Sequence, residues 1–374
     1  MAEFSFDGLR RWPDVEAPNL VAADATDRLI ADESAPAVRA NPAAVAVIGD
    51  RYGALTLAAI AVNGAAGVRV HQDPLSGELA LASNAQSAGL GDRYASHRLD
   101  AELVGGARVV LLQLPKSLAE LLEIAEVVAG HADSDVVVYA GGRVKHMTPT
   151  MNEVLRTCFA DVSATLARQK SRLLVAREPR PDVEPTYPRR EHHDDVDLWV
   201  CAHGATFGGT KIDLGTRFLL GFVDRMAPAA ARAVDLGCGT GVLATVLARS
   251  RPELQVVATD ESAAATASAT ETAAANEVGA RVTVLRDDAM ASMPDQSVDL
   301  IVCNPPFHLG TSVHAGAAIK LFGAARRVLR PGGELWTVFN THLAYRGALG
   351  RIVGQTRVVG RNARFTATVS KNTA

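Results

Sequence analysis

The sequence predicts an α/β protein with two tandem Rossmann-like domains, each built on a doubly wound sheet. Apolar runs alternate with helical segments along the C-terminal half, which is the pattern of repeated βα units. The N-terminal half repeats the same order more faintly, and a proline-rich stretch lies between the halves. The chain has 374 residues, which is enough for two ordinary domains.

In the C-terminal half, each expected strand is a short apolar run that ends in glycine or a polar residue. These strands cover residues 232–236, 255–259, 281–286, 298–303 and 335–339. Helices are expected at 241–250, 262–277 and 311–329, with Ser262 as the cap of the second. Arg330-Pro331-Gly332-Gly333 is a stop signal after the third helix. The parallel sheet then ends in a hairpin within 357–369.

The N-terminal half predicts strands at 44–48, 67–71, 107–114 and 135–139. Its first turn, Gly49-Asp50-Arg51-Tyr52-Gly53, keeps only two glycines and leads into a helix. We interpret this half as a degenerate copy of the other, produced by duplication, that has lost its cofactor site. The alternative is that any two doubly wound domains look alike at this level of detail.

A proline-rich stretch marks the boundary between the halves. Residues 178–190 contain four prolines among charged residues, so neither a helix nor a central strand fits there. We expect a first domain at 1–180, an extended linker at 181–190 and a second, catalytic domain at 191–374.

The composition limits the class of protein. Hydrophobic residues make up 48% of the chain, which supports two full cores, and a net charge of −3 gives no overall attraction for nucleic acid. The four cysteines lack CxxC spacing, so neither a zinc site nor a disulfide framework is expected. No signal peptide or membrane-spanning run is visible. We expect a cytoplasmic monomer without a metal.

A glycine-rich turn follows the first strand of the C-terminal half. Gly237, Gly239 and Gly241 allow a ligand to approach the backbone, and Cys238 and Thr240 lie between them. The G-x-G-x-G spacing differs from the G-x-G-x-x-G of dinucleotide-binding domains. Asp235, two residues before the turn, repels a phosphate and attracts an ammonium group. The pattern therefore predicts a ligand with a cationic amino-acid part.

The next two strand ends carry further acids. Asp260, with Glu261 beside it, is placed to accept hydrogen bonds from ribose hydroxyls. Asp288 is placed to accept from an adenine amino group, and Ala289 leaves room for the ring. Asp287 competes with Asp288 for this role, and one of the two caps the following turn. Ribose, adenine and a charged amino acid together describe S-adenosylmethionine.

Asn304-Pro305-Pro306-Phe307 follows the fourth strand and suits a planar amine. The Asn304 oxygen and the Pro305 carbonyl accept the two amine hydrogens, Pro306 stiffens the loop, and Phe307 stacks on the ring. Each signal taken alone has an ordinary structural explanation. However, the four features fall at four successive strand ends, on the edge where such sheets bind ligands.

These motifs resemble those of class I S-adenosylmethionine-dependent methyltransferases. The tetrapeptide is similar to the acceptor motif of enzymes that methylate adenine, guanine or glutamine. The segment "FGGTKIDLGTRFLL" at 207–220, "NPPFHL" at 304–309 and "NTHLAY" at 340–345 resemble the bacterial ribosomal RNA guanine-N2 methyltransferases. Strings at 114–117, 142–146 and 167–173 look more like the large-subunit branch of that family.

The resemblance implies an rRNA guanine-N2 methyltransferase, with 23S favoured over 16S RNA as substrate. It implies ribosomal RNA or a ribosomal subunit as partner, and it adds Phe207 to the cofactor site. The chemistry expected is a direct displacement at the methyl group, in which positioning supplies most of the acceleration. Guanine N2 is paired in a duplex, so the base must be single-stranded or flipped out. His308 follows the motif, but no catalytic role is assigned to it.

Two groups of basic residues are candidates for contact with RNA phosphates. No acid follows Glu334, whereas six cations do: Arg346, Arg351, Arg357, Arg361, Arg364 and Lys371. The second group comprises Arg168, Lys170, Arg172, Arg177, Arg189 and Arg190. The alternative for each is a solvated face whose acids come from other segments.

Two other functions fit part of the pattern. One is a protein glutamine N5-methyltransferase, which shares the acceptor tetrapeptide. The other is a non-catalytic assembly factor that binds rRNA. The intact acids, glycines and Asn304 argue against the second. The glycine spacing and Asp235 argue against a nicotinamide oxidoreductase.

Overall fold

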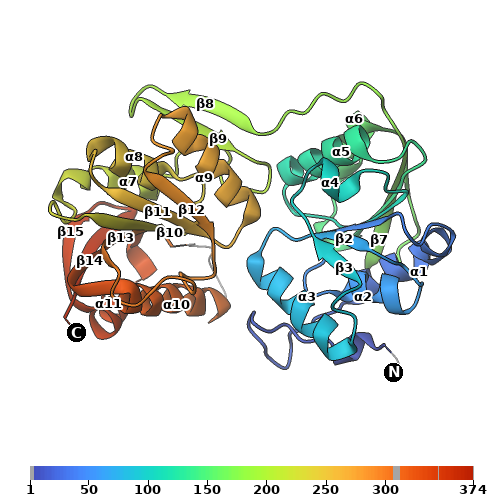
Figure 1. Ribbon diagram of the computed structural model, residues 1–374, viewed down its shortest axis with the longest axis horizontal. Helices are drawn as coiled ribbons and strands as arrows, with labels where there is room; N and C mark the ends of the chain where they lie inside the picture. Colours follow the sequence, from blue (N-terminus) through green and yellow to red (C-terminus); the bar gives the residue numbers. More distant parts are fainter. Residues whose placement is uncertain (1–3, 306–311, 344, 374) are drawn as a thin grey trace. The chain divides into compact units, whose positions relative to one another are not determined.

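The computed structural model describes residues 4–305, 312–343 and 345–373 (Figure 1). The chain divides into two compact units, Met1–Tyr187 and Pro188–Ala374. Of the residues singled out in the sequence, Pro306, Phe307 and His308 lie outside the described part.

The second unit contains a seven-stranded sheet in the order β12-β11-β10-β13-β14-β16-β15. The first five strands in this order are mutually parallel, as predicted. The last two form the predicted hairpin, and β16 runs antiparallel to β14, so the sheet is mixed rather than wholly parallel. The strands are β10 (Arg232–Leu236), β11 (Gln255–Asp260), β12 (Val282–Arg286), β13 (Val298–Cys303), β14 (Leu329–Asn340), β15 (Gly354–Arg361) and β16 (Phe365–Asn372).

Helices cover both faces of this sheet. Side chains alternate along a strand, so Ala233, Leu300 and Val302 pack in one cluster with α8 and α9, while Val234 and Ile301 pack in another with α10 and α11. The sheet is therefore doubly wound. The helices are α7 (Leu214–Leu220), α8 (Val242–Ser250), α9 (Ala263–Ala275), α10 (Ser312–Val328) and α11 (Arg346–Ile352), with 3₁₀ turns η3 (Val223–Arg225) and η4 (Thr341–Leu343).

Two local predictions in this unit meet different outcomes. Ser262 caps α9 as predicted, because its side chain accepts from the Ala265 N–H. The third helix ends before residues 330–333 as predicted, since α10 ends at Val328, but the strand expected to begin at 335 begins at Leu329, so residues 330–333 lie inside β14. The pairing of β13 with β14 shifts register between Val298 and Leu300, and such a bulge accommodates proline and glycine within a strand.

The first unit has a sheet of the same strand order, β3-β2-β1-β4-β5-β7-β6. Its strands are β1 (Val45–Ile48), β2 (Val68–His71), β3 (Tyr94–Ser96), β4 (Val109–Gln113), β5 (Val137–Arg143), β6 (Phe159–Ala164) and β7 (Ser171–Pro179). Its helices are α1 (Ala25–Ala40), α2 (Ala54–Ala61), α3 (Leu75–Ala88), α4 (Ala101–Val104), α5 (Leu118–His131) and α6 (Pro149–Cys158), with 3₁₀ turns η1 (Phe6–Gly8) and η2 (Val144–His146). Two tandem Rossmann-like units are therefore present, as predicted.

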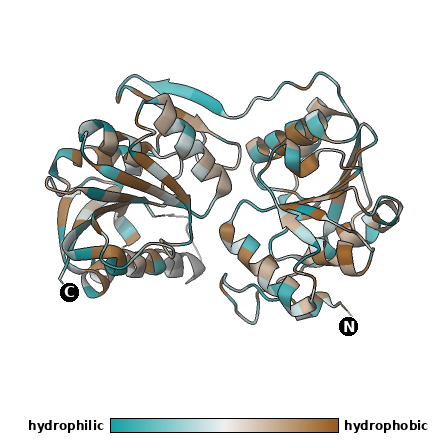
Figure 2. Ribbon diagram, viewed as in Figure 1, coloured by the Kyte–Doolittle hydropathy of each residue, from teal (hydrophilic) through white to brown (hydrophobic). Residues whose placement is uncertain are grey.

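A short antiparallel ribbon opens the second unit. Its strands are β8 (Arg189–His193) and β9 (Leu198–Ala202), and Figure 2 shows β8 as hydrophilic. β9 packs on α9, where the Cys201 N–H donates to the Thr272 hydroxyl over 3.0 Å. The expected linker at 181–190 therefore overlaps β8, because Arg189 and Arg190 pair with Ala202 and Cys201.

No helix in the described ranges is long and apolar enough to cross a membrane. The four cysteines are buried and unpaired. Among the residues that the structure describes, no group of three or more His, Cys, Asp or Glu side chains is arranged to hold a metal ion.

Candidate active site

The strand register of the second unit brings the predicted site residues to one edge of the sheet. Leu236 pairs with Thr259 on one side and with Cys303 on the other, and Asp260 pairs with Arg286. The residues that end or follow these parallel strands lie at the same carboxyl edge: Gly237, Asp260, Asp287 and Asn304.

The turn after β10 presents bare backbone. Gly237, Gly239 and Gly241 have φ values of +72°, +52° and +74°, in the left-handed region that favours glycine. A Cβ atom built on Gly237 or Gly239 would have no heavy atom within 4 Å, whereas one on Gly241 would lie 2.8 Å from the Ala269 Cβ. The first two glycines therefore face open space, and the third allows α8 and α9 to pack closely.

Asp235 lies beneath this turn. Its side chain is 1% exposed, and one oxygen accepts the Ala244 N–H over 2.9 Å in the first turn of α8. Burial, with a further contribution from the charge of Asp260, raises the pKa of this carboxyl to about 7. The acid that was predicted to attract an ammonium group therefore also holds the helix that follows the turn.

Asp260 ends β11 with both carboxylate oxygens engaged. One accepts the Gly239 N–H over 3.0 Å and the other the Ser262 N–H over 3.0 Å. These contacts fix the carboxylate beside the glycine turn. Glu261, the next residue, is exposed.

The two acids after β12 have different roles. Asp287 is buried and accepts from the Ser292 N–H and hydroxyl over 3.0 and 2.6 Å, so it caps the turn. Asp288 is half-buried and pairs with the Lys320 ammonium over 2.5 Å. Ala289 has a positive φ of +52°. Of the competing pair, Asp288 is thus the acid that is not used to build the turn.

Asn304 lies at the end of β13 with its side-chain amide held from one side. Its Nδ2 donates to the Asp213 Oδ1 over 2.8 Å and to the Thr216 hydroxyl over 3.0 Å. Its Oδ1 is buried and has no hydrogen-bond partner among the described residues. Such an acceptor is costly to leave unpaired, so the geometry fits a ligand that supplies an N–H. Pro305 beside it is buried.

Known families match both units. The RLMG N-terminal domain matches residues 2–180 and the methyltransferase small domain matches residues 197–368. Ribosomal RNA large subunit methyltransferase G of Streptomyces avermitilis is 33% identical over 96% of this chain and 94% of its own. The proteins of the same name from Streptomyces coelicolor and Pseudomonas putida are 35% and 34% identical, over 96% of this chain and 96% and 95% of theirs.

The chain belongs to the ribosomal RNA large subunit methyltransferase G family. The predicted enzyme class, an rRNA methyltransferase that uses S-adenosylmethionine, and the predicted large-subunit branch are confirmed by this membership. A solved structure of a T. thermophilus 16S rRNA N2 methyltransferase (RsmC), in complex with AdoMet and guanosine, has the same fold with a TM-score of 0.74. It is 18% identical, and the match covers 93% of this chain and 92% of that one.

The first unit of this family member has replaced the corresponding residues. By strand register, Val47 holds the place of Asp235, Arg51 that of Gly239 and Gln72 that of Asp260. Asp50 is fully buried and accepts from the N–H groups of Gly53, Leu55 and Thr56 over 3.1, 3.3 and 2.8 Å. The N–H groups at the start of α2 thus have a hydrogen-bond acceptor in Asp50 of the chain itself. In this physical sense the first unit is a degenerate copy of the second.

Asp213 and Thr216 were missed as site residues in the sequence. They lie within the segment that resembles the family, but an Asp three residues before a Thr predicts only a helix start. Asp213 does cap α7, accepting from Gly215 and Thr216 over 2.8 and 3.2 Å. Phe207, included through the resemblance, precedes this helix and is 71% exposed.

The cysteines of the site are neutral packing residues. Burial raises the pKa of the Cys238 and Cys303 thiols well above the ordinary range. Thr240, beside Cys238 in the turn, is half-buried.

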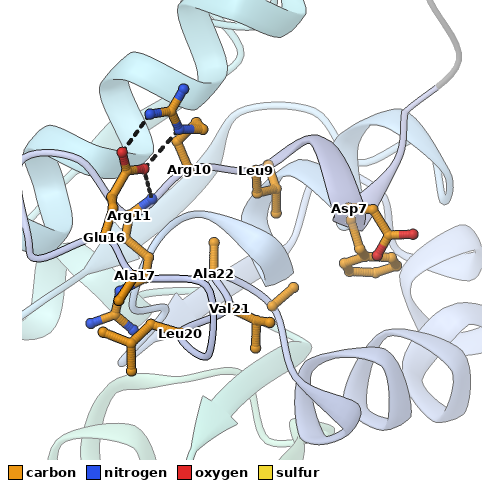
Figure 3. Close-up of a pocket in the computed structure, with 11 residues that line it drawn as sticks. Asp7, Leu9, Arg10, Arg11, Glu16, Ala17, Leu20, Val21 and Ala22 are labelled. Carbon is orange, nitrogen blue, oxygen red and sulfur yellow. Dashed lines mark hydrogen bonds and ion pairs between the residues drawn. The ribbon is translucent and has the colours of Figure 1, made fainter.

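A separate cavity of about 540 Å³ lies in the first unit (Figure 3). It is formed by the N-terminal segment, where the Arg10 Nε donates to Glu16 over 2.7 Å. None of its lining residues is a predicted site residue: Phe6, Asp7, Leu9, Arg10, Arg11, Glu16, Ala17, Leu20, Val21, Ala22 and Ala23.

Proposed function

We propose that this protein transfers a methyl group from S-adenosylmethionine to the exocyclic N2 amine of a guanine in large-subunit ribosomal RNA. The observation that carries this proposal is the unpartnered, buried Asn304 Oδ1 at the same sheet edge as the bare glycine turn. Membership of the large-subunit methyltransferase family supports the choice of 23S over 16S RNA.

The cofactor fits the residues of the turn. The open space over Gly237 and Gly239 admits a ligand against the backbone, and the fixed Asp260 carboxylate suits ribose hydroxyls. Asp288 and Ala289 would lie beside the adenine. When bound, S-adenosylmethionine supplies a methyl group on a positively charged sulfur, which is an electrophile open to direct displacement.

The acceptor residues would orient a weak nucleophile. The N2 lone pair of guanine is delocalised into the ring, and two acceptors on its hydrogens turn that lone pair toward the methyl group. Asn304 Oδ1 and the Pro305 carbonyl are those acceptors, and Phe307, from the sequence pattern, would stack on the base. The N2–carbon bond forms as the sulfur–carbon bond breaks, and one N2 proton passes to water. Positioning supplies most of the acceleration.

A basic surface in the C-terminal tail would contact the RNA backbone. Arg346, Arg351, Arg357, Arg361, Arg364 and Lys371 are all exposed, and none pairs with a carboxylate among the described residues. Asn340, at the carboxyl end of β14, pairs with Phe365, so the β15–β16 turn lies at the same sheet edge as Asn304. Arg361 and Arg364 flank this turn and are therefore the members best placed near the acceptor.

The second basic group is a weaker candidate. Arg168 pairs with Asp32 over 2.5 Å and Arg177 with Asp161 over 3.5 Å. Arg190 stacks on the Trp199 ring at 4.1 Å. If the second group is an ordinary solvated face, its arginines need partners from other segments of the chain. These contacts supply such partners. We further propose that the enzyme acts in the cytoplasm, since its substrate is ribosomal RNA, and that it acts as a monomer.

The test is transfer of labelled methyl from S-adenosylmethionine to large subunits, small subunits, their deproteinised RNAs and release factor, all from undermethylated cells. Label recovered as N2-methylguanine in 23S RNA supports the proposal. Label in release factor would favour glutamine methylation. Binding of rRNA in the absence of S-adenosylmethionine, together with no label in any acceptor, would favour the alternative of a non-catalytic assembly factor.

A further inference from the structure

We propose that Asp213 and Thr216 are positioning residues that lock the Asn304 amide with its oxygen toward the acceptor amine. This inference rests on the proposed function. It assigns a role to two residues that touch neither the transferred methyl group nor the amine. Together with Asn304 they form what we term the amide lock.

The contacts use both hydrogens of the Asn304 amide. Nδ2 lies 2.8 Å from the Asp213 Oδ1 and 3.0 Å from the Thr216 hydroxyl. An amide NH₂ has two hydrogens, so no donor remains for another partner. Oδ1 is left buried and without a hydrogen-bond partner among the described residues.

The carboxylate determines which way the amide faces. An ionised Asp is only an acceptor, so a flipped Asn304 would place its oxygen against the oxygen of Asp213. The flipped state would also leave a buried NH₂ where an acceptor for the guanine amine is needed. The lock therefore selects one of two sterically similar orientations.

Asp213 is itself immobilised by the first turn of α7. The same Oδ1 accepts from the Gly215 N–H over 2.8 Å and from the Thr216 N–H over 3.2 Å. A Cβ atom on Gly215 would lie 2.9 Å from Asp213 Oδ1 and 3.3 Å from Asn304 Oδ1. Glycine at this position therefore leaves room for both oxygens.

The competing explanation is that these contacts only stabilise the fold. Asp213 is the N-cap of α7 in any case, so its simple removal would mix the two effects. Substitutions that are tolerated at the N-cap of α7 but remove the contact with Asn304 separate the effect on stability from the effect on the amide.

Asp213→Gly is the informative variant. Glycine is an accepted N-cap residue, and it has no side-chain oxygen to accept from the Asn304 amide. We expect kcat for methyl transfer to fall about 10- to 100-fold, because misorientation of a reacting group has effects of this size. The KM and dissociation constant for S-adenosylmethionine and the melting temperature should stay as in the wild type.

Asp213→Asn is the conservative control. Its single amide oxygen can accept from Gly215, Thr216 and Asn304 as the Asp213 Oδ1 does. We expect kcat within about threefold of the wild type. Thr216→Ser keeps the hydroxyl and should also be nearly neutral, whereas Thr216→Val should resemble Asp213→Gly with a smaller loss.

A double-substitution cycle completes the test. Combined with Asn304→Ala, Asp213→Gly should cause no further loss, because both act on one amide. A full additional loss on that background, or a lower melting temperature with unchanged kcat, would overturn the proposal. If the wild type methylates no guanine, the proposed function fails instead, and the lock is then tested on whichever acceptor becomes labelled.

Discussion

The side-chain amide of Gln113 donates a hydrogen bond to the carboxylate of Asp27, and both residues are buried. Gln113 ends β4 next to β1, at the position that Asn304 holds after β13. Asp27 lies in the first turn of α1, the helix before β1, as Thr216 lies in the first turn of α7. Both units therefore link an amide at this sheet edge to the preceding helix, but the first unit has buried the amide.

The residues that the first unit has in place of the glycine turn lead to a prediction about Asp50. Asp50→Ala removes a buried acceptor from three backbone N–H groups and should lower the free energy of unfolding of the first unit by about 2–4 kcal/mol. Hydrogen exchange of the backbone amides of the first unit measures this, because Trp199 and Trp336 of the second unit would also contribute to tryptophan fluorescence. Affinity for S-adenosylmethionine should not change, and a large loss of cofactor binding would contradict a single cofactor site in the second unit.

Asn304→Ala tests the acceptor residue directly. It removes the free Oδ1 and should lower kcat for methyl transfer by roughly 10²–10³, as loss of one well-placed hydrogen-bonding group does. Affinity for S-adenosylmethionine and for rRNA should stay close to wild type. Filter binding of the RNA and calorimetry of the cofactor provide the controls. Methylation at the wild-type rate would remove Asn304 from the mechanism.

The glycine turn offers a matched pair of substitutions. Gly241→Ala places a Cβ 2.8 Å from the Ala269 Cβ at a positive φ, so it should cost about 2–4 kcal/mol of stability. Gly239→Ala has open space and should cost only about 1–2 kcal/mol for the left-handed backbone. It should nevertheless weaken cofactor binding at least tenfold, because the methyl group enters the proposed cofactor space. Thermal melts and calorimetry would show this opposite ranking, and equal effects on both measurements would contradict it.

The sequence predicted the parts of the fold that depend on local pattern. The apolar runs that end at Leu236, Thr259 and Cys303 form buried strands. The glycine or polar residue that follows each run helped to mark where the strand ends. It missed α1, which contains Pro36 within the helix, a residue that usually ends one. It also placed the start of β14 at 335 rather than at Leu329, because a helix stop signal does not show whether a bulge in a paired strand can accommodate proline and glycine.

The amide lock could not be predicted from sequence spacing. Asp213 and Asn304 are 91 residues apart, and only the packing of α7 against the end of β13 brings them together. The burial of Asp235 was likewise hidden, since a residue two places before a turn can face the ligand or the core. The choice between Asp287 and Asp288 needed the contacts to Ser292 and Lys320.

Reversing the charge at the β15–β16 turn tests the proposed RNA surface. Arg361→Glu and Arg364→Glu, made one at a time, should each weaken rRNA binding and make the salt dependence shallower by about one counterion. Lys371→Glu is the matched control, because it makes the same change of charge away from the turn. Lys371 lies near the far end of β16, opposite Glu334 of β14 in the strand register. Binding isotherms at several salt concentrations measure both. Equal loss from the control and from each of the two turn variants would assign the effect to net charge alone.

The raised pKa of Asp235 predicts a pH dependence of cofactor binding. Burial raises that pKa to about 7, above the ordinary value of 3.8, so the folded protein favours the neutral acid and this group's contribution to stability declines as pH rises toward 7. A nearby ammonium group favours the carboxylate. Binding should therefore release a proton below about pH 7.

Affinity for S-adenosylmethionine should accordingly increase between pH 5.5 and 7.5, by up to about tenfold for each unit by which binding lowers the pKa. Calorimetry in buffers of different ionisation enthalpy measures both the affinity and the released proton. Asp235→Asn, which keeps an acceptor for the Ala244 N–H, should flatten the profile. A flat profile in the wild type would mean that Asp235 only holds α8 and that the ammonium group is recognised by other residues.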